Sequence, residues 1–178
     1  MIIPLPTQIV AEPNRSTFKG RMKGAPYYCI YNVGSYTFAP FKVIWPEMSS
    51  EFCAAVVSNA NVPLQGSKPY IPDHKVFFVD FQNEHDAYFL CGLLNSSIAK
   101  ELIEAHNIST QMGDVLKHIN LPAFNKASKK HRELADKVKM AHLEHDKEKR
   151  KGIIDQVVLL ADRIITATIT RRLKQPES

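Results

Sequence analysis

The sequence has few of the residues on which nucleotide-binding enzymes, secreted proteins and membrane proteins depend. Its 178 residues include only seven glycines, and no G-x-G-x-x-G or G-x-x-x-x-G-K-[ST] segment is present to cradle a phosphate. Cys29, Cys53 and Cys91 are odd in number and form no C-x-x-C pair, so neither a disulfide framework nor a thiolate zinc site is indicated. No run approaches the roughly 20 apolar residues that cross a bilayer, and residues 1–11 lack the features of a signal peptide. We therefore expect a cytoplasmic protein.

Common catalytic motifs are also absent. The chain contains neither G-x-S-x-G nor H-E-x-x-H, which excludes the usual α/β-hydrolase and zinc protease sites. His142, His145 and Asp146 have a helical spacing at which side chains can gather round a metal ion. Their segment is strongly charged, so a solvent-exposed helix face is the simpler interpretation. The sequence therefore predicts no catalytic residues and no metal site in this chain.

One short segment keeps a nuclease hypothesis open. Asp73 stands two residues before Lys75, at the start of an apolar run. Metal-dependent nucleases use such a pair, because the carboxylate helps to hold a divalent ion and the lysine positions or deprotonates the attacking water. A second acid is also needed, and Glu47 and Glu51 are the upstream candidates. The D-x-K pattern is common in proteins, so this is the third of our hypotheses.

Charge is distributed unevenly along the chain, whose formal net charge is +5 and whose isoelectric point is about 9.1. Residues 47–125 carry four Lys against nine Asp or Glu, whereas residues 126–151 carry ten Lys or Arg against five. Residues 13–46 contain no acid and five cations: Arg15, Lys19, Arg21, Lys23 and Lys42. DNA would be attracted to the first and last of these three blocks. For residues 126–151, a solvated helix surface of mixed charge is an equally good interpretation.

The first half of the chain has the pattern of a sheet. Aromatic and β-branched residues, separated by turn-like segments, predict strands at residues 27–31, 36–45, 52–57 and 75–81. Pro40 lies inside the second of these and cannot donate a ladder hydrogen bond, so we expect an edge strand or a bulge there. Residues 59–68, which include Pro63 and Gly66, are expected to form a loop.

Beyond residue 82 the apolar residues repeat with a helical period. Asn83 or Asp86 can cap a first helix, and Ser96 or Ser97 can restart it, so one bent helix or two short ones would fit. Residues 107–114 are predicted to form a loop, and residues 116–124 an extended segment.

Two further helices are expected near the carboxyl end. Ser128 is the predicted N-cap of a charged helix whose apolar stripe is thin: Leu134, Val138 and Ala141. A strongly apolar helix face follows Gly152: Ile153, Val157, Leu160, Ala161, Ile164, Ile165, Thr168 and Ile169. This face must be buried, either against the charged helix or on a partner. We therefore predict an α+β fold, with a small, mostly antiparallel sheet and packed helices over residues 1–125 and a C-terminal helical hairpin over residues 126–178.

Several segments, in a fixed order, resemble a known family. Residues 28–45 read YCIYNVGSYTFAPFKVIW, and the further segments are KPYIPDHK at 68–75, YFLCGLLNSS at 88–97, ISTQ at 108–111 and INLPAF at 119–124. The series resembles the carboxy-terminal specificity region of bacterial adenine-specific DNA methyltransferases, including those fused to nucleases in type IIG restriction-modification enzymes. The likeness covers residues 15–145, and four or five ordered motifs are far more specific than one.

The resemblance implies recognition of double-stranded DNA without methyl transfer by this chain. In that family a separate, preceding domain binds S-adenosylmethionine with a glycine-bearing loop, and an N-P-P-[YF] segment holds the flipped adenine. Neither motif is present here. The resemblance therefore implies no cofactor in this chain and a methyltransferase catalytic domain supplied in cis or in trans.

Candidate DNA contacts follow from the residue types and from the matched segments. The five cations of residues 13–46 can reach phosphates, and polar side chains in the matched loops can address base edges. The candidates are Arg15, Lys19, Arg21, Lys23, Lys42, His74, Lys75, Thr110 and Gln111. Local turn capping is the alternative role for the polar ones, and for His74 and Thr110 it is an equally good interpretation.

A protein-interaction module is the second functional hypothesis. In it, the apolar face of residues 153–169 and the charged helix dock onto a methyltransferase or nuclease subunit. The nuclease based on Asp73 and Lys75 is the third.

Overall fold

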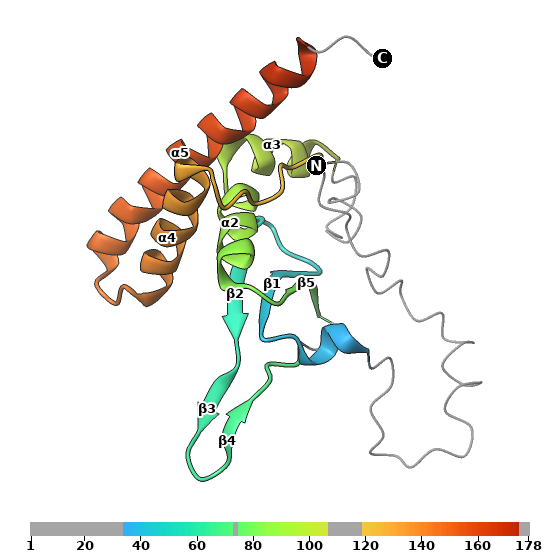
Figure 1. Ribbon diagram of the computed structural model, residues 1–178, viewed down its shortest axis with the longest axis vertical. Helices are drawn as coiled ribbons and strands as arrows, with labels where there is room; N and C mark the ends of the chain where they lie inside the picture. The colour runs from blue at the N-terminus through green and yellow to red at the C-terminus, as the bar shows by residue number, and fades with distance from the viewer. Residues whose placement is uncertain (1–33, 73–74, 107–118, 175–178) are drawn as a thin grey trace, which may run out of the picture.

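A computed structural model describes residues 34–72, 75–106 and 119–174 (Figure 1). In chain order the described elements are the 3-10 helix η1, strands β1 to β5 and helices α2 to α5. The fold is α+β, and its described strands pair antiparallel, as the sequence predicts. The strand expected at 27–31 and the loop expected at 107–114 lie outside the described residues.

The larger sheet has three strands in the order β2-β1-β5, which are β1 Phe41–Pro46, β2 Ala55–Ser58 and β5 Val76–Phe81. On the central strand, Val43 lies opposite Val56 on one side and Val79 on the other. All three are buried, and directly opposed residues share one face of a sheet. They form an apolar row, and helix α2 contacts all three strands.

Pro40 interrupts the strand expected at 36–45. The residues before it form η1 (Ser35–Phe38), and β1 starts only after it. Because β1 is the central strand, the expectation of an edge strand or a bulge at Pro40 is wrong. Proline has no amide hydrogen to donate, and Pro40 stands just outside the ladder, where its carbonyl accepts a hydrogen bond from the Asn59 amide at 3.2 Å.

Residues 59–68 contain a second, two-stranded sheet where a loop was expected. β3 (Ala60–Val62) pairs with β4 (Gly66–Lys68), and we call residues 60–68 the β3–β4 ribbon. Gly66 has a φ of 75°, which glycine adopts without strain and which closes the short turn. Each strand has only three residues, too few for an alternating pattern to be visible in the sequence.

Helix α2 (Glu84–Leu94) lies at the centre of the molecule. Asn83 caps it by accepting a hydrogen bond from the His85 amide at 2.9 Å, so Asn83 is the observed cap of the two expected. Seven of its eleven residues are buried, as in a helix covered on several sides. Ser96 accepts a hydrogen bond from the Ala99 amide at 3.1 Å and starts α3 (Ser97–His106), so the segment forms two helices.

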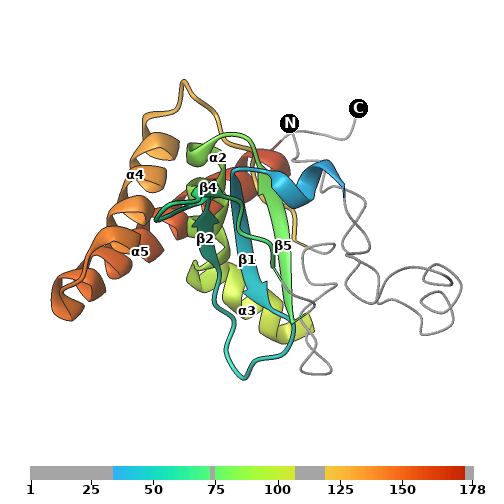
Figure 2. The same ribbon diagram turned by 90° about the horizontal axis from the view of Figure 1, so that it is seen from below.

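Helices α4 (Lys129–Leu143) and α5 (Lys147–Leu173) form the expected hairpin. Figure 2 shows it on the β2 side of the sheet. The predicted cap is confirmed, since Ser128 accepts a hydrogen bond from the His131 amide at 3.4 Å. Asp146 caps α5 by accepting from the Lys149 amide at 2.9 Å, so α5 begins before Gly152 and includes it.

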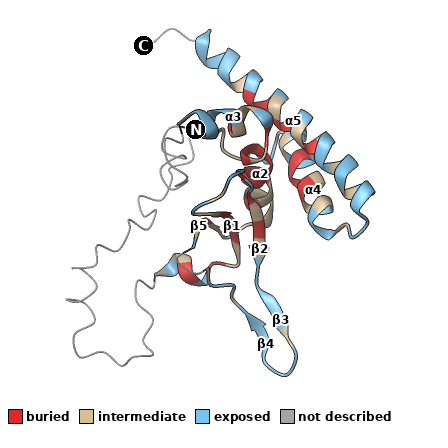
Figure 3. Cartoon of the chain, turned by 180° about the vertical axis from the view of Figure 1, so that it is seen from behind, coloured by how far each residue is buried: buried red, intermediate tan, exposed pale blue. Residues whose placement is uncertain are grey.

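One continuous apolar core joins the sheet, α2 and the helical hairpin (Figure 3). Ile169, which was expected on the buried face of α5, is exposed. The residues of α5 that are buried are Val157, Ala161, Ile164 and Ile165. The apolar face is therefore covered mainly within the chain, by α4, α2 and α3. The division into residues 1–125 and 126–178 stays a prediction.

Candidate nucleic-acid interface

The β3–β4 ribbon extends from the end of β2 away from the helices (Figure 1). From residue 58 to residue 68 every side chain is exposed except that of Val62, which is half-buried. The ribbon and its first flanking residue carry amide, hydroxyl and ammonium groups: Asn59, Asn61, Gln65, Ser67 and Lys68. These groups can donate hydrogen bonds to base edges or phosphates, and the amides and hydroxyl can also accept them.

The segment that leads into the ribbon is held by two helices. Asn95, at the end of α2, accepts from the Ala54 amide at 3.1 Å and donates to the Ala54 carbonyl at 2.8 Å. His142, on α4, accepts from the Val56 amide through Nε2 at 3.0 Å. Its Nδ1 lies 2.9 Å from the Val138 carbonyl, so the neutral ring with its proton on Nδ1 satisfies both contacts. These bonds fix β2, and hence the direction in which the ribbon leaves the core.

The tip of the ribbon carries an unusual leucine. Leu64 has a φ of 65°, a region that bulky residues rarely occupy. Leu64 is fully exposed. The turn is closed by a hydrogen bond from the Gln65 amide to the Val62 carbonyl at 3.0 Å. A large apolar side chain is thus presented at the outermost point of a polar ribbon.

Exposed lysines lie at the α4–α5 turn, which is the lower end of the helical hairpin in Figure 1. Lys147, Lys149 and Lys151 are exposed on the first turns of α5. The bond between His142 and the Val56 amide places the end of α4 beside β2, which leads directly into the ribbon. The α4–α5 turn therefore lies near the strand from which the ribbon leaves the core.

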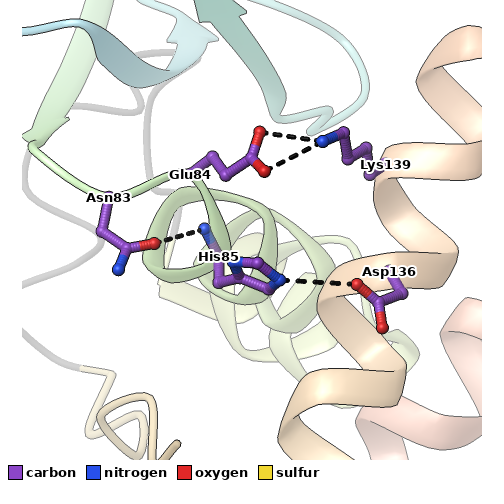
Figure 4. A network of polar contacts seen from close by, with 5 residues as sticks. All are labelled: Asn83, Glu84, His85, Asp136 and Lys139. Carbon is purple, nitrogen blue, oxygen red and sulfur yellow. Dashed lines mark hydrogen bonds and ion pairs between the residues drawn. The ribbon is translucent and has the colours of Figure 1, made fainter.

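Other charges of the helical hairpin serve the fold (Figure 4). Lys139 donates to both carboxylate oxygens of Glu84 at 2.9 Å, and this bonding raises the pKa of Lys139. His85 lies 3.6 Å from Asp136 in a second contact between α2 and α4. Part of the basic block at 126–151 thus joins helices, in line with the mixed-charge interpretation, and part remains exposed.

Lys42, a predicted phosphate contact, is a buried residue of β1. Its relative exposure is 1%, and its Nζ donates to the Ala39 carbonyl at 2.8 Å. Burial lowers the pKa of Lys42, while the charge of Asp80, opposite on β5, acts in the other direction. In this arrangement the ammonium group stabilises the start of β1 and cannot also contact a phosphate, so we leave Lys42 out of the proposed DNA contacts below.

Lys75 is exposed immediately before β5, and its carbonyl accepts from the Glu47 amide at 2.9 Å. The remaining predicted contacts lie outside the described residues: Arg15, Lys19, Arg21, Lys23, His74, Thr110 and Gln111. Asp73 lies outside them as well, so the nuclease hypothesis stays a prediction.

The sequence interpretation missed the polar residues of the β3–β4 ribbon. One signal was available: residues 52–72 contain no acid, and their only charge is Lys68. An acid-free exposed segment is compatible with a polyanion.

The described residues contain no group of three or more His, Cys, Asp or Glu side chains suited to a metal ion. Of the three residues considered for such a site, His142 already uses both ring nitrogens and Asp146 caps α5. Within the described part of the chain, no helix has the length and apolarity to cross a membrane.

Comparison with known proteins gives one partial match. Over 76 residues the chain is 32% identical to the type II methyltransferase M.NspV of Nostoc sp. (strain ATCC 29411 / PCC 7524). Part of this chain is similar to a type II methyltransferase. The match covers 43% of the chain and 15% of that protein's length. No protein-family model and no solved structure matches.

Proposed function

We propose that this chain is the DNA-binding target-recognition part of a restriction-modification N6-adenine DNA methyltransferase, and that methyl transfer is performed by a catalytic domain in cis or in trans. The observation that carries the proposal is the partial similarity to a type II methyltransferase. The ordered sequence segments at 28–124 support a role in specificity, and type IIG enzymes are included in that resemblance.

The geometry supports the same role. A DNA-binding protein contacts the phosphates of a duplex with its cationic side chains and the base edges with its polar side chains. Lysines are exposed at the start of α5 and the polar ribbon is exposed beyond β2, and the bond from the Val56 amide to His142 brings the end of α4 beside β2. We assign the lysines to phosphates, together with Arg15, Lys19, Arg21 and Lys23 of the acid-free block, and we retain His74, Lys75, Thr110 and Gln111 as proposed contacts.

A fluorescence-anisotropy titration of the full chain with a labelled duplex at several salt concentrations tests the proposal. If the seven cations assigned above each contact a phosphate, the logarithm of the affinity should fall with the logarithm of salt at a slope of about −6. Replacing Lys147, Lys149 and Lys151 by glutamine should reduce that slope by about 2.7, since each contact contributes about 0.9. Lys100→Gln, on α3, is the matched control and should leave it unchanged. Absence of binding at low salt, or binding that salt does not weaken, would contradict the proposal.

Exposed apolar side chains on the helical hairpin favour a second candidate function, docking onto a methyltransferase or nuclease subunit. Met140 and Leu143 of α4, and Ile154 and Leu159 of α5, are exposed. Apolar surface of this kind can mark a protein interface. Sedimentation velocity should then show self-association of the isolated chain that Leu159→Gln weakens. A strictly monomeric chain would count against this function.

A further inference from the structure

The β3–β4 ribbon has features that folding alone does not explain. A two-stranded ribbon without a covered face is only marginally stable in water, and nearly every side chain of this one is exposed. Leu64 adds an exposed apolar side chain at a positive φ of 65°, which is unfavourable for a leucine. Residues with these properties are expected to contribute through contacts outside the chain.

The strand register divides the ribbon into two different faces. Asn61 lies opposite Ser67, and Ala60 lies opposite Lys68. Opposed residues point to the same side and successive residues to opposite sides. One face therefore presents the amide of Asn61 beside the hydroxyl of Ser67. The other presents Lys68 beside small Ala60.

The charge of this region suits a polyanion such as DNA. Residues 52–72 carry Lys68 as their only charge, so nothing in the ribbon repels a phosphate. The α4–α5 turn, with its exposed lysines, lies near β2, since His142 at the end of α4 accepts a hydrogen bond from the Val56 amide. A basic partner would find no carboxylate on the ribbon to bind.

Resting on the proposed function, we infer that the β3–β4 ribbon enters the major groove of the target duplex and reads its sequence. The major groove admits a two-stranded ribbon, and an asparagine can bond adenine N6 and N7 there while apolar side chains contact the thymine methyl group. The Asn61 and Ser67 face lies against the base edges. Leu64 contacts thymine methyl groups at the tip, and Lys68 reaches a flanking phosphate.

Selection of duplexes by the full chain tests this assignment. The probe is a pool of duplexes with a randomised centre, from which bound molecules are sequenced. Affinities are then measured for the most enriched duplex and for a scrambled one. The double variant Asn61→Ala, Ser67→Ala should lose about 5- to 150-fold of the preference for the enriched duplex, the equivalent of one bidentate base contact. Its affinity for the scrambled duplex should be unchanged.

Two further measurements identify the groove and the roles of single residues. Placing 7-deazapurines in the enriched duplex removes the N7 acceptors of the major groove, so it should weaken binding of the wild-type chain and weaken binding of the Asn61→Ala variant less. Leu64→Ala should lower the preference for thymine at one or two positions. Lys68→Gln should reduce the salt slope by about 0.9 on both duplexes.

The matched control is the double variant Gln82→Ala, Thr166→Ala, which changes two exposed polar residues outside the ribbon. It should keep both affinities, and melting curves should show that all variants are folded. If the wild-type chain binds no duplex, both the proposed function and this inference are overturned. If it binds without sequence preference, the target-recognition role and this inference are both overturned and only DNA binding stands. If it has a preference that the ribbon variants keep, the inference alone is overturned and the proposed function stands.

Discussion

Replacing Gly92 by alanine tests how closely α4 packs against α2. A Cβ atom at Gly92 would lie 2.9 Å from Val138 Cγ2 and 3.0 Å from Leu134 Cδ1. Both separations are shorter than the usual carbon–carbon contact of about 3.5–4.0 Å. Val138 and Leu134 are buried, and the β-branched Val138 has little rotamer freedom in a helix. Gly92→Ala should therefore push the two helices apart.

The magnitude follows from two opposing effects. Overpacking of a core costs about 1–3 kcal/mol, and alanine favours the helix over glycine by about 0.8–1.0 kcal/mol. Gly152 is a matched control, because it lies inside α5 and no atom is within 4 Å of a Cβ placed there. Gly152→Ala should show the helix effect alone and stabilise the chain. The two variants should thus differ in free energy of unfolding by about 1–3 kcal/mol.

Thermal unfolding followed by circular dichroism measures this difference. For a chain of this size it corresponds to about 2–12 °C between the two melting temperatures, with Gly92→Ala the lower. Gly92→Val should lower the melting temperature further, since it adds two more methyl groups to the same contact. Equal stabilisation by Gly92→Ala and Gly152→Ala would refute the close packing of α4 on α2.

Three further predictions concern single side chains. Burial lowers the pKa of His131 below its ordinary value of 6.5, so below pH 6.5 the unfolded chain binds more protons than the folded one, and stability is lost as the pH falls through the folded-state pKa. The melting temperature should therefore drop between pH 7.5 and pH 5, and it should drop less for His131→Asn. An equal drop in both proteins would contradict this. Burial raises the pKa of Cys91 to about 12, whereas Cys53 is exposed. Treatment of the folded chain with iodoacetamide at pH 8, followed by peptide mass spectrometry, should therefore show alkylation of Cys53 and not of Cys91. Comparable alkylation of both would show that the core is open. The contact between Glu84 and Lys139 is partly exposed and should give a coupling of about 0.2–1 kcal/mol in a double-mutant cycle, weaker in 1 M salt; coupling that salt does not reduce would argue against an ion pair.

Local capping signals predicted the helices well. Asn83 and Ser128 each have a side-chain oxygen placed just before an apolar repeat, and each caps the helix that follows it. The start of α5 was misplaced because residues 144–151 are as polar as the helix before them. The hydrogen bonds from the Lys149 amide to the Asp146 side chain and from the Arg150 amide to the Asp146 carbonyl mark the new helix.

Features that depend on distant contacts were not visible in the sequence. The pairing of β3 with β4 involves three residues on each side, below the length at which alternation is a signal. Lys42 has the composition of a surface cation, yet its position on the central strand of the sheet buries it. Counting charges along the chain cannot distinguish a surface lysine from a buried one, because burial depends on which strands lie on either side.

The β3–β4 ribbon projects from the core and is exposed along nearly its whole length. Asn95 and His142 form hydrogen bonds with Ala54 and Val56, just before the ribbon begins. Leu64 is exposed at the far end of the ribbon. A small rotation of β2 would therefore move the tip of the ribbon farther than its base, while the core keeps its packing. Replacing Asn95 or His142 should therefore alter the direction in which the whole ribbon leaves the core, without changing any residue of the ribbon itself.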